Sequence, residues 1–191
     1  NRLPVCLQNV ACTIEGLRVR RKKYGALTKK YLSGSMERDT WSYAQKCAYR
    51  DGQIRQMVEH CYYHVPYYHN LFDKLGIDYK RIRTLDDLEV LPILTKDIVR
   101  NNCKELIADN ISERACYHMH TSGTTGSSLK FLYSKEAYAI QWADEQRYEH
   151  TLGITVDEWS AYFGGRSIVP KDCKKPPFYR INYAMKEVMF S

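Results

Sequence analysis

A run of eight small residues near the middle of the chain, positions 121–128, most constrains what this sequence can fold into. It contains six hydroxyl side chains and two glycines, and none of its residues requires a hydrophobic core. Just before it, Tyr117 and Met119 alternate with two histidines, and residues 129–133 just after it are mainly apolar and aromatic. Such flanking segments are typical of short β-strands. We therefore predict a loop held between two strands.

The composition of this loop favours phosphate binding. Glycines leave backbone N–H groups unobstructed and hydroxyl groups add rotatable donors, which suits an oligophosphate whose oxygens point in several directions. A plain surface turn remains the alternative, because Gly, Ser and Thr are also common in turns for local reasons. The candidate nucleotide-binding residues are Thr121, Ser122, Gly123, Thr124, Thr125 and Gly126.

Two other loops that contact phosphates can be compared with this one. A Walker loop has four residues between its glycines and then Gly-Lys-Ser or Gly-Lys-Thr. Here only two residues separate Gly123 from Gly126, and no lysine follows directly, so the loop is not of the Walker type. A KH module clamps a nucleic-acid backbone with Gly-x-x-Gly. Residues 123–126 match that short pattern, but the flanking strands and the hydroxyl groups fit it poorly.

The run Thr-Ser-Gly-Thr-Thr-Gly at 121–126 is similar to the signature of adenylate-forming enzymes, the superfamily of acyl- and aryl-CoA ligases, luciferases and peptide-synthetase adenylation domains. Upstream segments resemble the approach to this loop in the phenylacetate-CoA ligase branch, and most of all in its CapK-like group of capsular polysaccharide biosynthesis. The resemblance covers residues 41–191. The upstream segments are 65–68 (VPYY), 75–77 (LGI), 85–88 (LDDL) and 91–96 (LPILTK).

The resemblance implies an α/β fold, namely the N-terminal part of the layered large domain of these enzymes. It implies an AMP-forming ligase that uses ATP and Mg²⁺ to activate a small carboxylate and passes the acyl or aryl group to CoA or another acceptor. The implied setting is capsular polysaccharide biosynthesis. Members of the superfamily run to over twice this length, and their later motifs, including a catalytic lysine, have no counterpart here. We therefore expect a fragment with little turnover of its own and name no catalytic residue.

The sequence suggests three regions. Residues 1–40 form a basic N-terminal arm that includes Arg-Val-Arg-Arg-Lys-Lys at 18–23, residues 41–114 are mainly helical, and residues 115–191 form a strand–loop–strand–helix–strand region. The arm could grip a polyanion, although basic runs are more often solvated helix faces. Arg166, beside two glycines, is a further candidate anion contact.

Several helices can be placed from periodicity and end signals. A helix should end near His64, because Pro66 disfavours helical geometry at the residue before it. A short helix should follow and stop at Gly76, Thr95 should cap a helix that runs to Arg100, and residues 84–87 have the spacing of a capping box. A long helix is expected over 135–152, capped by Ser134. The expected core face of the first helix comprises Ala44, Cys47, Ala48, Ile54, Val58 and Cys61.

Composition excludes some classes of protein and leaves others open. Seven irregularly spaced cysteines argue against a disulfide framework, and no apolar run reaches the roughly 18 residues of a membrane span, so we expect a cytoplasmic protein. His60, Cys61 and His64 share a helix face, but without a fourth ligand nearby we expect no metal site.

The net charge of +7 suits polyanions in general. Nucleic acid is not the expected partner, yet a nucleic-acid-binding module using the arm and the GTTG loop is the alternative function, and a non-catalytic domain of the same fold is a third.

Overall fold

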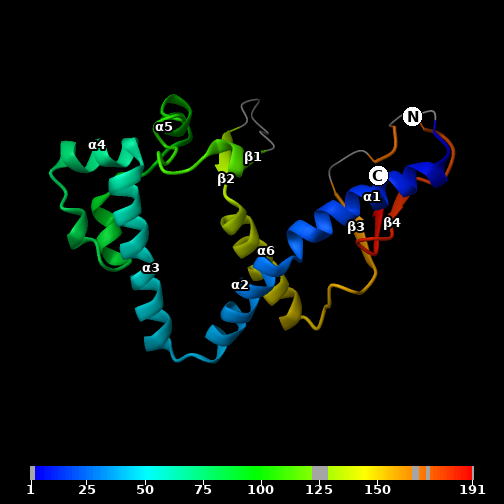
Figure 1. Cartoon of the computed structure of the whole chain (residues 1–191), viewed down its shortest axis with the longest axis horizontal. Coiled ribbons are helices and arrows are strands. Elements are labelled where there is room, and N and C mark those ends of the chain that lie inside the picture. Colours follow the sequence, from blue (N-terminus) through cyan, green and yellow to red (C-terminus); the bar gives the residue numbers. More distant parts are fainter. Residues whose placement is uncertain (1–2, 122–128, 165–167, 171–172, 191) are drawn as a thin grey trace. The chain divides into compact units, whose positions relative to one another are not determined.

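The computed structural model describes residues 3–121, 129–164, 168–170 and 173–190 (Figure 1). The chain forms two compact units. Asn1–Glu37 and Tyr138–Ser191 make one, called here the terminal unit, and Arg38–Ala137 make the other, the central unit. Both contain helices and short strands, so the mixed helix-and-sheet class expected from the sequence is confirmed.

In the central unit, α3 (Tyr43–His64) ends and α4 (Pro66–Leu75) begins and ends at the predicted signals, and the start of α3 adds a capping box that was not predicted. In this box the Gln45 N–H donates to the Ser42 hydroxyl at 3.3 Å and the Ser42 N–H donates to the Gln45 side chain at 2.9 Å. Val65 is extended before Pro66, as expected. α4 then ends at Gly76, whose φ of 63° lies in the left-handed region that glycine tolerates.

The core of the central unit lies between α4, the second half of α3 and the segment after α4. Its buried side chains are Val58, Phe72 and Ile82. The predicted core face of α3 is confirmed for Val58, which is buried, and for Ile54, which packs against this cluster. It is wrong for Ala44 and Ala48, which are exposed because α4 packs against α3 only further along. Their methyl groups add little burial in any case.

Two shorter elements follow. Thr95 caps α5 (Lys96–Asn101) as predicted, its hydroxyl accepting from the Ile98 N–H at 3.3 Å. The box at residues 84–87 opens only a 3₁₀ turn, Asp86–Val90. The Asp87 carboxylate accepts from the Arg83 N–H, the Thr84 N–H and the Thr84 hydroxyl, and these bonds hold the pKa of Asp87 below its usual value.

The terminal unit contains a three-stranded sheet in the order β3-β5-β4. β3 (Ser160–Phe163) runs parallel to the central strand β5 (Glu187–Phe190), and β4 (Tyr179–Asn182) runs antiparallel to it. The last strand of the predicted strand–loop–strand–helix–strand region corresponds to β3. Residues 1–40, which the sequence sets apart as an arm, contain α1 (Val5–Lys23) and α2 (Ala26–Glu37), and α1 packs against β4.

Side chains of α1 take the place of a neighbouring strand along the outer edge of β4. The Ile181 N–H donates to the Asn9 side chain at 3.1 Å, and the Tyr183 N–H donates to the Thr13 hydroxyl at 3.2 Å. The buried Arg180 guanidinium donates to the Gln8 side chain at 2.7 Å. An uncovered strand edge is open to pairing with other chains, and here a polar helix face covers it.

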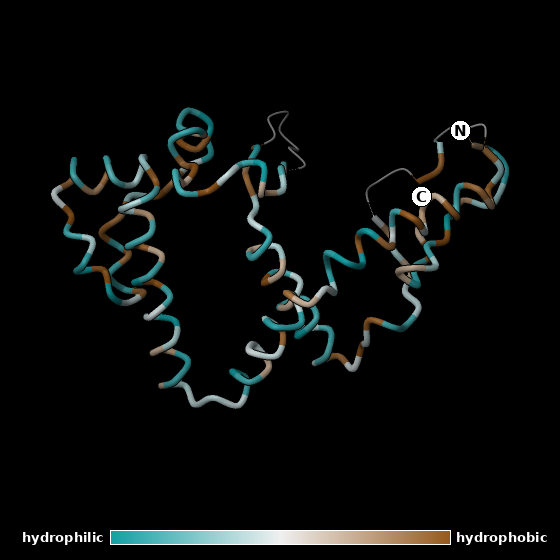
Figure 2. The backbone as a smooth tube through the Cα atoms, in the orientation of Figure 1, coloured by the Kyte–Doolittle hydropathy of each residue, from teal (hydrophilic) through white to brown (hydrophobic). Residues whose placement is uncertain are grey.

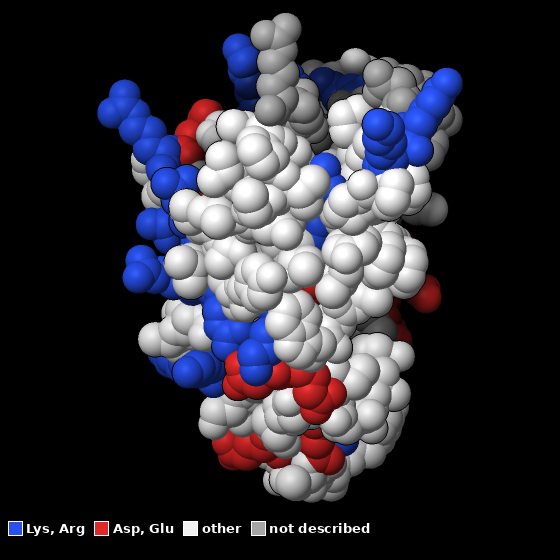
Figure 3. Space-filling view, turned by 90° about the vertical axis from the view of Figure 1, so that its right-hand side faces the viewer, with Lys and Arg blue, Asp and Glu red and all other residues white. Residues whose placement is uncertain are grey.

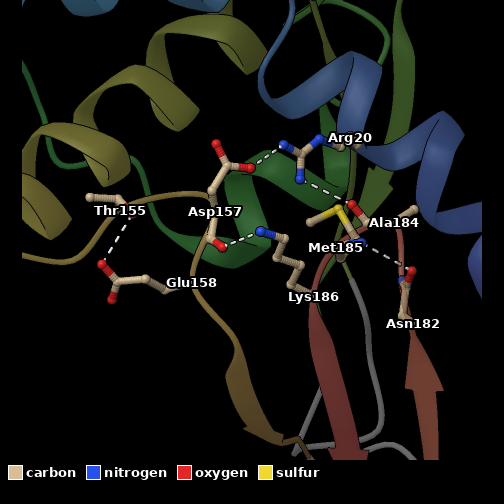
Figure 4. A network of polar contacts seen from close by, with 8 residues as sticks. All are labelled: Arg20, Thr155, Asp157, Glu158, Asn182, Ala184, Met185 and Lys186. Atoms are coloured by element: carbon tan, nitrogen blue, oxygen red, sulfur yellow. Dashed lines mark hydrogen bonds and ion pairs between the residues drawn. The ribbon is translucent and has the colours of Figure 1, made fainter.

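A polar network ties the C-terminal end of α1 to the loops of the sheet (Figure 4). The Arg20 guanidinium donates to the Asp157 carboxylate at 2.8 Å and to the Ala184 carbonyl at 3.0 Å. The Lys186 ammonium donates to the Asp157 carbonyl at 2.6 Å. Arg20 lowers the pKa of Asp157 through its hydrogen bond and its charge. The segment before β3, the β4–β5 turn and α1 are thus joined.

α6 (Lys135–Thr151) confirms the predicted long helix. The Ser134 hydroxyl accepts from the Ala137 N–H at 3.0 Å, and Gly153 has a φ of 73° just beyond the helix end. Ala139, Ala143 and Gln146 form its buried face. Among the residues that the structure covers, no helix is long and apolar enough to cross a membrane.

Candidate functional site

A two-stranded hairpin in the central unit carries the candidate phosphate loop. β1 (Tyr117–His120) pairs antiparallel with β2 (Lys130–Tyr133), so that Tyr117 lies opposite Tyr133 and His120 lies opposite Lys130. The predicted strand–loop–strand arrangement is therefore confirmed for the flanks. The register brings the two ends of the loop together.

The base of the loop is closed by two hydrogen bonds beyond the last strand pair. The Thr121 N–H donates to the Leu129 carbonyl at 3.0 Å, and the Leu129 N–H donates to the Thr121 hydroxyl at 3.0 Å. Of the six candidate binding residues, Thr121 thus lies at the base, where its hydroxyl oxygen bonds the opposite backbone. The other candidates lie outside the described residues, as does Arg166: Ser122, Gly123, Thr124, Thr125 and Gly126.

A cavity of about 970 Å³ lies beside the hairpin, within the central unit. Its walls come from α3, from residues 99–113 and from both hairpin strands. Apolar side chains make up most of the lining, including Val65, Leu106, Ile107, Ile111 and Phe131. The size and lining are those of a pocket for a small organic molecule.

Basic side chains from the hairpin also line this cavity. His118 and His120 of β1 and Lys130 of β2 contribute to it, and residues 99–113 add Lys104 and a single carboxylate, that of Glu113. An ammonium group and imidazoles around an apolar chamber can accommodate an apolar molecule with an anionic end. Because His120 and Lys130 are the last strand pair before Thr121 and Leu129, the cavity adjoins the base of the loop.

Three thiols, those of Cys61, Cys103 and Cys116, line the same cavity. Cys61 is half-buried and Cys103 is exposed. Burial raises the pKa of the Cys61 thiol, because the thiolate is poorly solvated there. In the part of the chain that the structure describes, every cysteine is a free thiol.

We expect iodoacetamide at pH 8 to modify Cys61 more slowly than Cys103. The thiolate is the reactive form, and the raised pKa of Cys61 leaves less of it. The rate at Cys61 should continue to rise as the pH passes the ordinary range of a thiol. Mass spectrometry of the two tryptic peptides measures both rates in one sample. Equal rates at pH 8 would contradict the burial of Cys61.

The histidines of α3 and α4 make local contacts. The His64 ring bonds the Asp109 carboxylate at 3.1 Å, and the His69 ring bonds the Tyr62 carbonyl at 3.0 Å. The rings of His60 and His64 lie 5.2 Å apart between centroids. Within the described ranges, no group of three or more His, Cys, Asp or Glu side chains is arranged to hold a metal ion.

Sequence reasoning missed the cavity almost entirely. Residues 99–113 supply one wall, and they show neither a motif nor a clear periodicity. The alternation within residues 117–120 was the available signal, but His118, Met119 and His120 all line the cavity, so the alternation did not single out its lining. That signal indicated a strand, and the strand was confirmed.

Comparison with known proteins gives two distant relatives. No protein-family model matches the chain. Protein CapK of Staphylococcus aureus is 26% identical over 195 residues, which cover 100% of this chain and 41% of CapK. Phenylacetate-coenzyme A ligase of Thermus thermophilus is 34% identical over 89 residues, which cover 46% of this chain and 20% of that protein.

The chain therefore spans about two-fifths of the length of CapK and about one-fifth of the length of the ligase. Both similarities are weak, and together with the run at 121–126 they suggest an adenylate-forming, ligase-like family.

Proposed function

We propose that this chain is the N-terminal part of a cytoplasmic, AMP-forming ligase of the CapK-like group. Such an enzyme activates a carboxylate with ATP to an acyl or aryl adenylate and transfers the acyl group to CoA or another acceptor. Capsular polysaccharide biosynthesis is the proposed setting. The name of the Thermus thermophilus relative supports the reaction class, and the match to Protein CapK supports the CapK-like group, both at low identity.

The observation that supports specific residues in this proposal is the closed base of the hairpin loop. Two hydrogen bonds join Thr121 to Leu129, so the seven residues between them start and end at one point on a paired strand edge. A segment whose two ends are already joined loses less chain entropy on binding than an open segment of the same length. In this proposal Thr121 fixes the base, and residues 122–126 contact the phosphates.

The proposed role of the loop follows from where negative charge develops during the reaction, on the departing pyrophosphate. An oxygen of the carboxylate attacks the α-phosphorus of ATP, the bond from that phosphorus to the β-bridging oxygen breaks, and its electron pair leaves with pyrophosphate. Hydroxyl donors of Ser122, Thr124 and Thr125, with amides freed by Gly123 and Gly126, would stabilise that growing charge. ATP would arrive with Mg²⁺ on its phosphates, and the metal would share the charge. The ionised carboxylate needs no general base.

We expect the double substitution Thr124→Ala with Thr125→Ala to lower ATP–pyrophosphate exchange by about tenfold to a hundredfold, because each lost donor weakens the stabilisation of the leaving group. The assay uses the enzyme of native length that carries this segment, with a panel of carboxylates that includes phenylacetate. Equilibrium dialysis of labelled ATP against the same proteins gives a second readout.

The matched control is Thr151→Ala with Thr155→Ala. These threonines are exposed in the terminal unit, and their hydroxyls bond only nearby groups, the Tyr148 carbonyl and the Glu158 carboxylate. The control should exchange like the wild type. If the loop variant also exchanges at the wild-type rate, the loop has no part in the reaction and the residue assignment fails.

A further inference from the structure

The hairpin gathers basic side chains on one of its faces, next to the loop. In the register of β1 and β2, His120 lies opposite Lys130, and His118 lies opposite Leu132. Opposite residues share a face of a hairpin, as do residues two positions apart along one strand. His118, His120 and Lys130 are therefore on the same face, and all three line the cavity of the central unit. We call these three residues the basic cluster.

The basic cluster has no direct partner within the described part of the chain. Among the described residues, none forms an ion pair or a side-chain hydrogen bond with His118, His120 or Lys130. The described lining of the cavity contains one carboxylate, that of Glu113. An ammonium group next to apolar walls loses hydration, which is costly unless an anion accompanies it. The cluster therefore favours an anionic occupant, and any polypeptide that covered it would have to supply an acidic side chain.

Positive charge alone does not identify a site in this protein. Figure 3 shows Lys and Arg side chains at several separate places on one face of the molecule, in keeping with the net charge of +7. The basic cluster differs from these because it borders a cavity of about 970 Å³ and adjoins Thr121 and Leu129, the base of the loop. It therefore combines anion-binding groups with a concave, apolar surface.

The other walls of the cavity suit a bulky apolar group. Leu106 and Ile107 are half-buried, and Ile111 is 39% exposed. Figure 2 shows both hydrophobic and hydrophilic stretches in the segment that joins α5 to the hairpin, to which these residues belong. Ligand pockets measure about 300–1,000 Å³, and this cavity is near the upper limit. A molecule the size of acetate would leave most of these walls without a contact.

We propose that the cavity binds a carboxylic acid with a bulky apolar tail, and that this acid is the substrate of the proposed reaction; its identity as the substrate rests on the proposed function. The carboxylate accepts hydrogen bonds from the Lys130 ammonium and the His120 ring, and the tail contacts residues 99–113. Because Thr121 and Leu129 adjoin this strand pair, the carboxylate lies next to the loop proposed to bind the phosphates. Lys130 is then a substrate-binding residue, and Ile111 limits the length of the tail.

Titration calorimetry on the 191-residue chain tests the anionic end. Octanoate is the probe, and octanamide has the same tail without the charge. We expect Lys130→Gln to weaken octanoate binding about tenfold to a hundredfold, because a charge-assisted hydrogen bond is lost, and to leave octanamide binding unchanged. Lys130→Arg should retain most of the affinity. Lys74→Gln, at an exposed position of α4 outside the cavity lining, is the matched control and should bind like the wild type.

ATP–pyrophosphate exchange by the enzyme of native length tests the apolar end. Ile111→Trp fills part of the cavity, so exchange with decanoate should fall about tenfold or more relative to exchange with hexanoate. Ile93→Trp makes the same change at a position that is 86% exposed and outside the lining, so it should leave the ratio of the two acids unchanged. A general loss of stability would lower exchange with both acids alike, so the ratio separates a binding role from a structural one.

The thiols of the cavity identify its occupant. In the native-length enzyme, octanoate should slow the reaction of Cys61 and Cys116 with iodoacetamide and leave that of Cys173, in the terminal unit, unchanged. The competing occupant is further polypeptide of a longer protein, because the chain spans 41% of CapK. If both cavity thiols are unreactive in the folded enzyme with and without octanoate, and react once it is unfolded, that polypeptide fills the cavity and the proposal is overturned.

The outcomes separate the cavity assignment from the proposed function. Exchange that depends on the loop but is unaffected by both Lys130→Gln and Ile111→Trp overturns the cavity assignment alone. Octanoate affinity that is equal in Lys130→Gln and the wild type overturns the role of Lys130. Protection of the cavity thiols by octanoate without exchange for any acid supports the binding site, but it overturns the proposed function and with it the identity of the acid as substrate.

Discussion

Replacing Phe72 by alanine should lower the free energy of unfolding of the central unit by about 3–5 kcal/mol. Phe72 is only 1% exposed and is the largest fully buried side chain among the described residues. It packs with Val58 and Ile82, and the Tyr62 ring meets its edge at a centroid distance of 6.0 Å. Removing the ring would leave a cavity between α3, α4 and the segment after α4, which supply these side chains. Domains are stable by only about 5–15 kcal/mol, so this loss is a large share of the total.

Urea denaturation followed by circular dichroism measures the total change, and hydrogen exchange of α3 peptides assigns it to the central unit. Phe72→Leu keeps most of the volume and should cost less than about 1.5 kcal/mol. Tyr43→Ala also removes an aromatic ring, but Tyr43 is 82% exposed and its replacement should leave the urea midpoint almost unchanged. If Phe72→Ala and Tyr43→Ala behave alike, Phe72 is not the centre of the core.

The sequence predicted helix ends better than helix faces. Pro66 and Gly76 bound α4 through local backbone geometry, and Ser134 caps α6 through a hydrogen bond to a residue three positions later. The buried face of α6 was not predicted. It consists of Ala139, Ala143 and Gln146, whereas the conspicuous aromatic residues of that helix lie elsewhere. Small buried residues give a weak periodic signal.

The role of the first 40 residues could not be predicted for a related reason. α1 exposes apolar side chains such as Leu7 and Ile14, while its inner side mixes polar residues with Val5 and Val19, so its hydrophobic pattern does not identify the buried face. The contacts that hold it reach from Asn9 and Thr13 to residues about 170 positions later. No local rule connects segments so far apart. The basic residues at 18–23 therefore dominated the interpretation of this region.

The candidate site also has one part that the sequence predicted, the loop, and one part that it did not, the cavity. The loop at 121–128 is a contiguous motif, so composition alone identified it, and the strands beside it were confirmed. The cavity is assembled from α3, residues 99–113 and the hairpin, which meet only in the folded unit. Its position beside His120 and Lys130 links the two parts of the site. In the proposed function the loop contacts the phosphates, and the apolar chamber beside the same strand pair suits the apolar portion of the substrate.

Alanine substitutions at two helical glycines should change stability in opposite directions. At Gly16 a new Cβ would overlap the Asn182 side-chain oxygen, and Asn182 is buried and accepts a hydrogen bond from the Met185 N–H. We expect Gly16→Ala to destabilise the terminal unit by roughly 1–3 kcal/mol, because α1 must move off β4 to relieve the overlap. The better helix propensity of alanine, worth about 1 kcal/mol, offsets only part of this loss.

Gly52, in α3, is the matched control. A Cβ there would meet only the end of the Arg55 side chain, at 3.8 Å, which is an ordinary contact. Gly52→Ala should therefore stabilise the central unit by about 0.5–1 kcal/mol through helix propensity alone. Chemical denaturation gives the sign of the stability change for both variants. In Gly16→Ala, the N–H groups of Ile181 and Tyr183 should exchange faster, because they lose their bonds to Asn9 and Thr13. Hydrogen exchange of peptides from β4 and the turn after it measures this change. Stabilisation by both substitutions would mean that α1 does not approach β4 as closely as described.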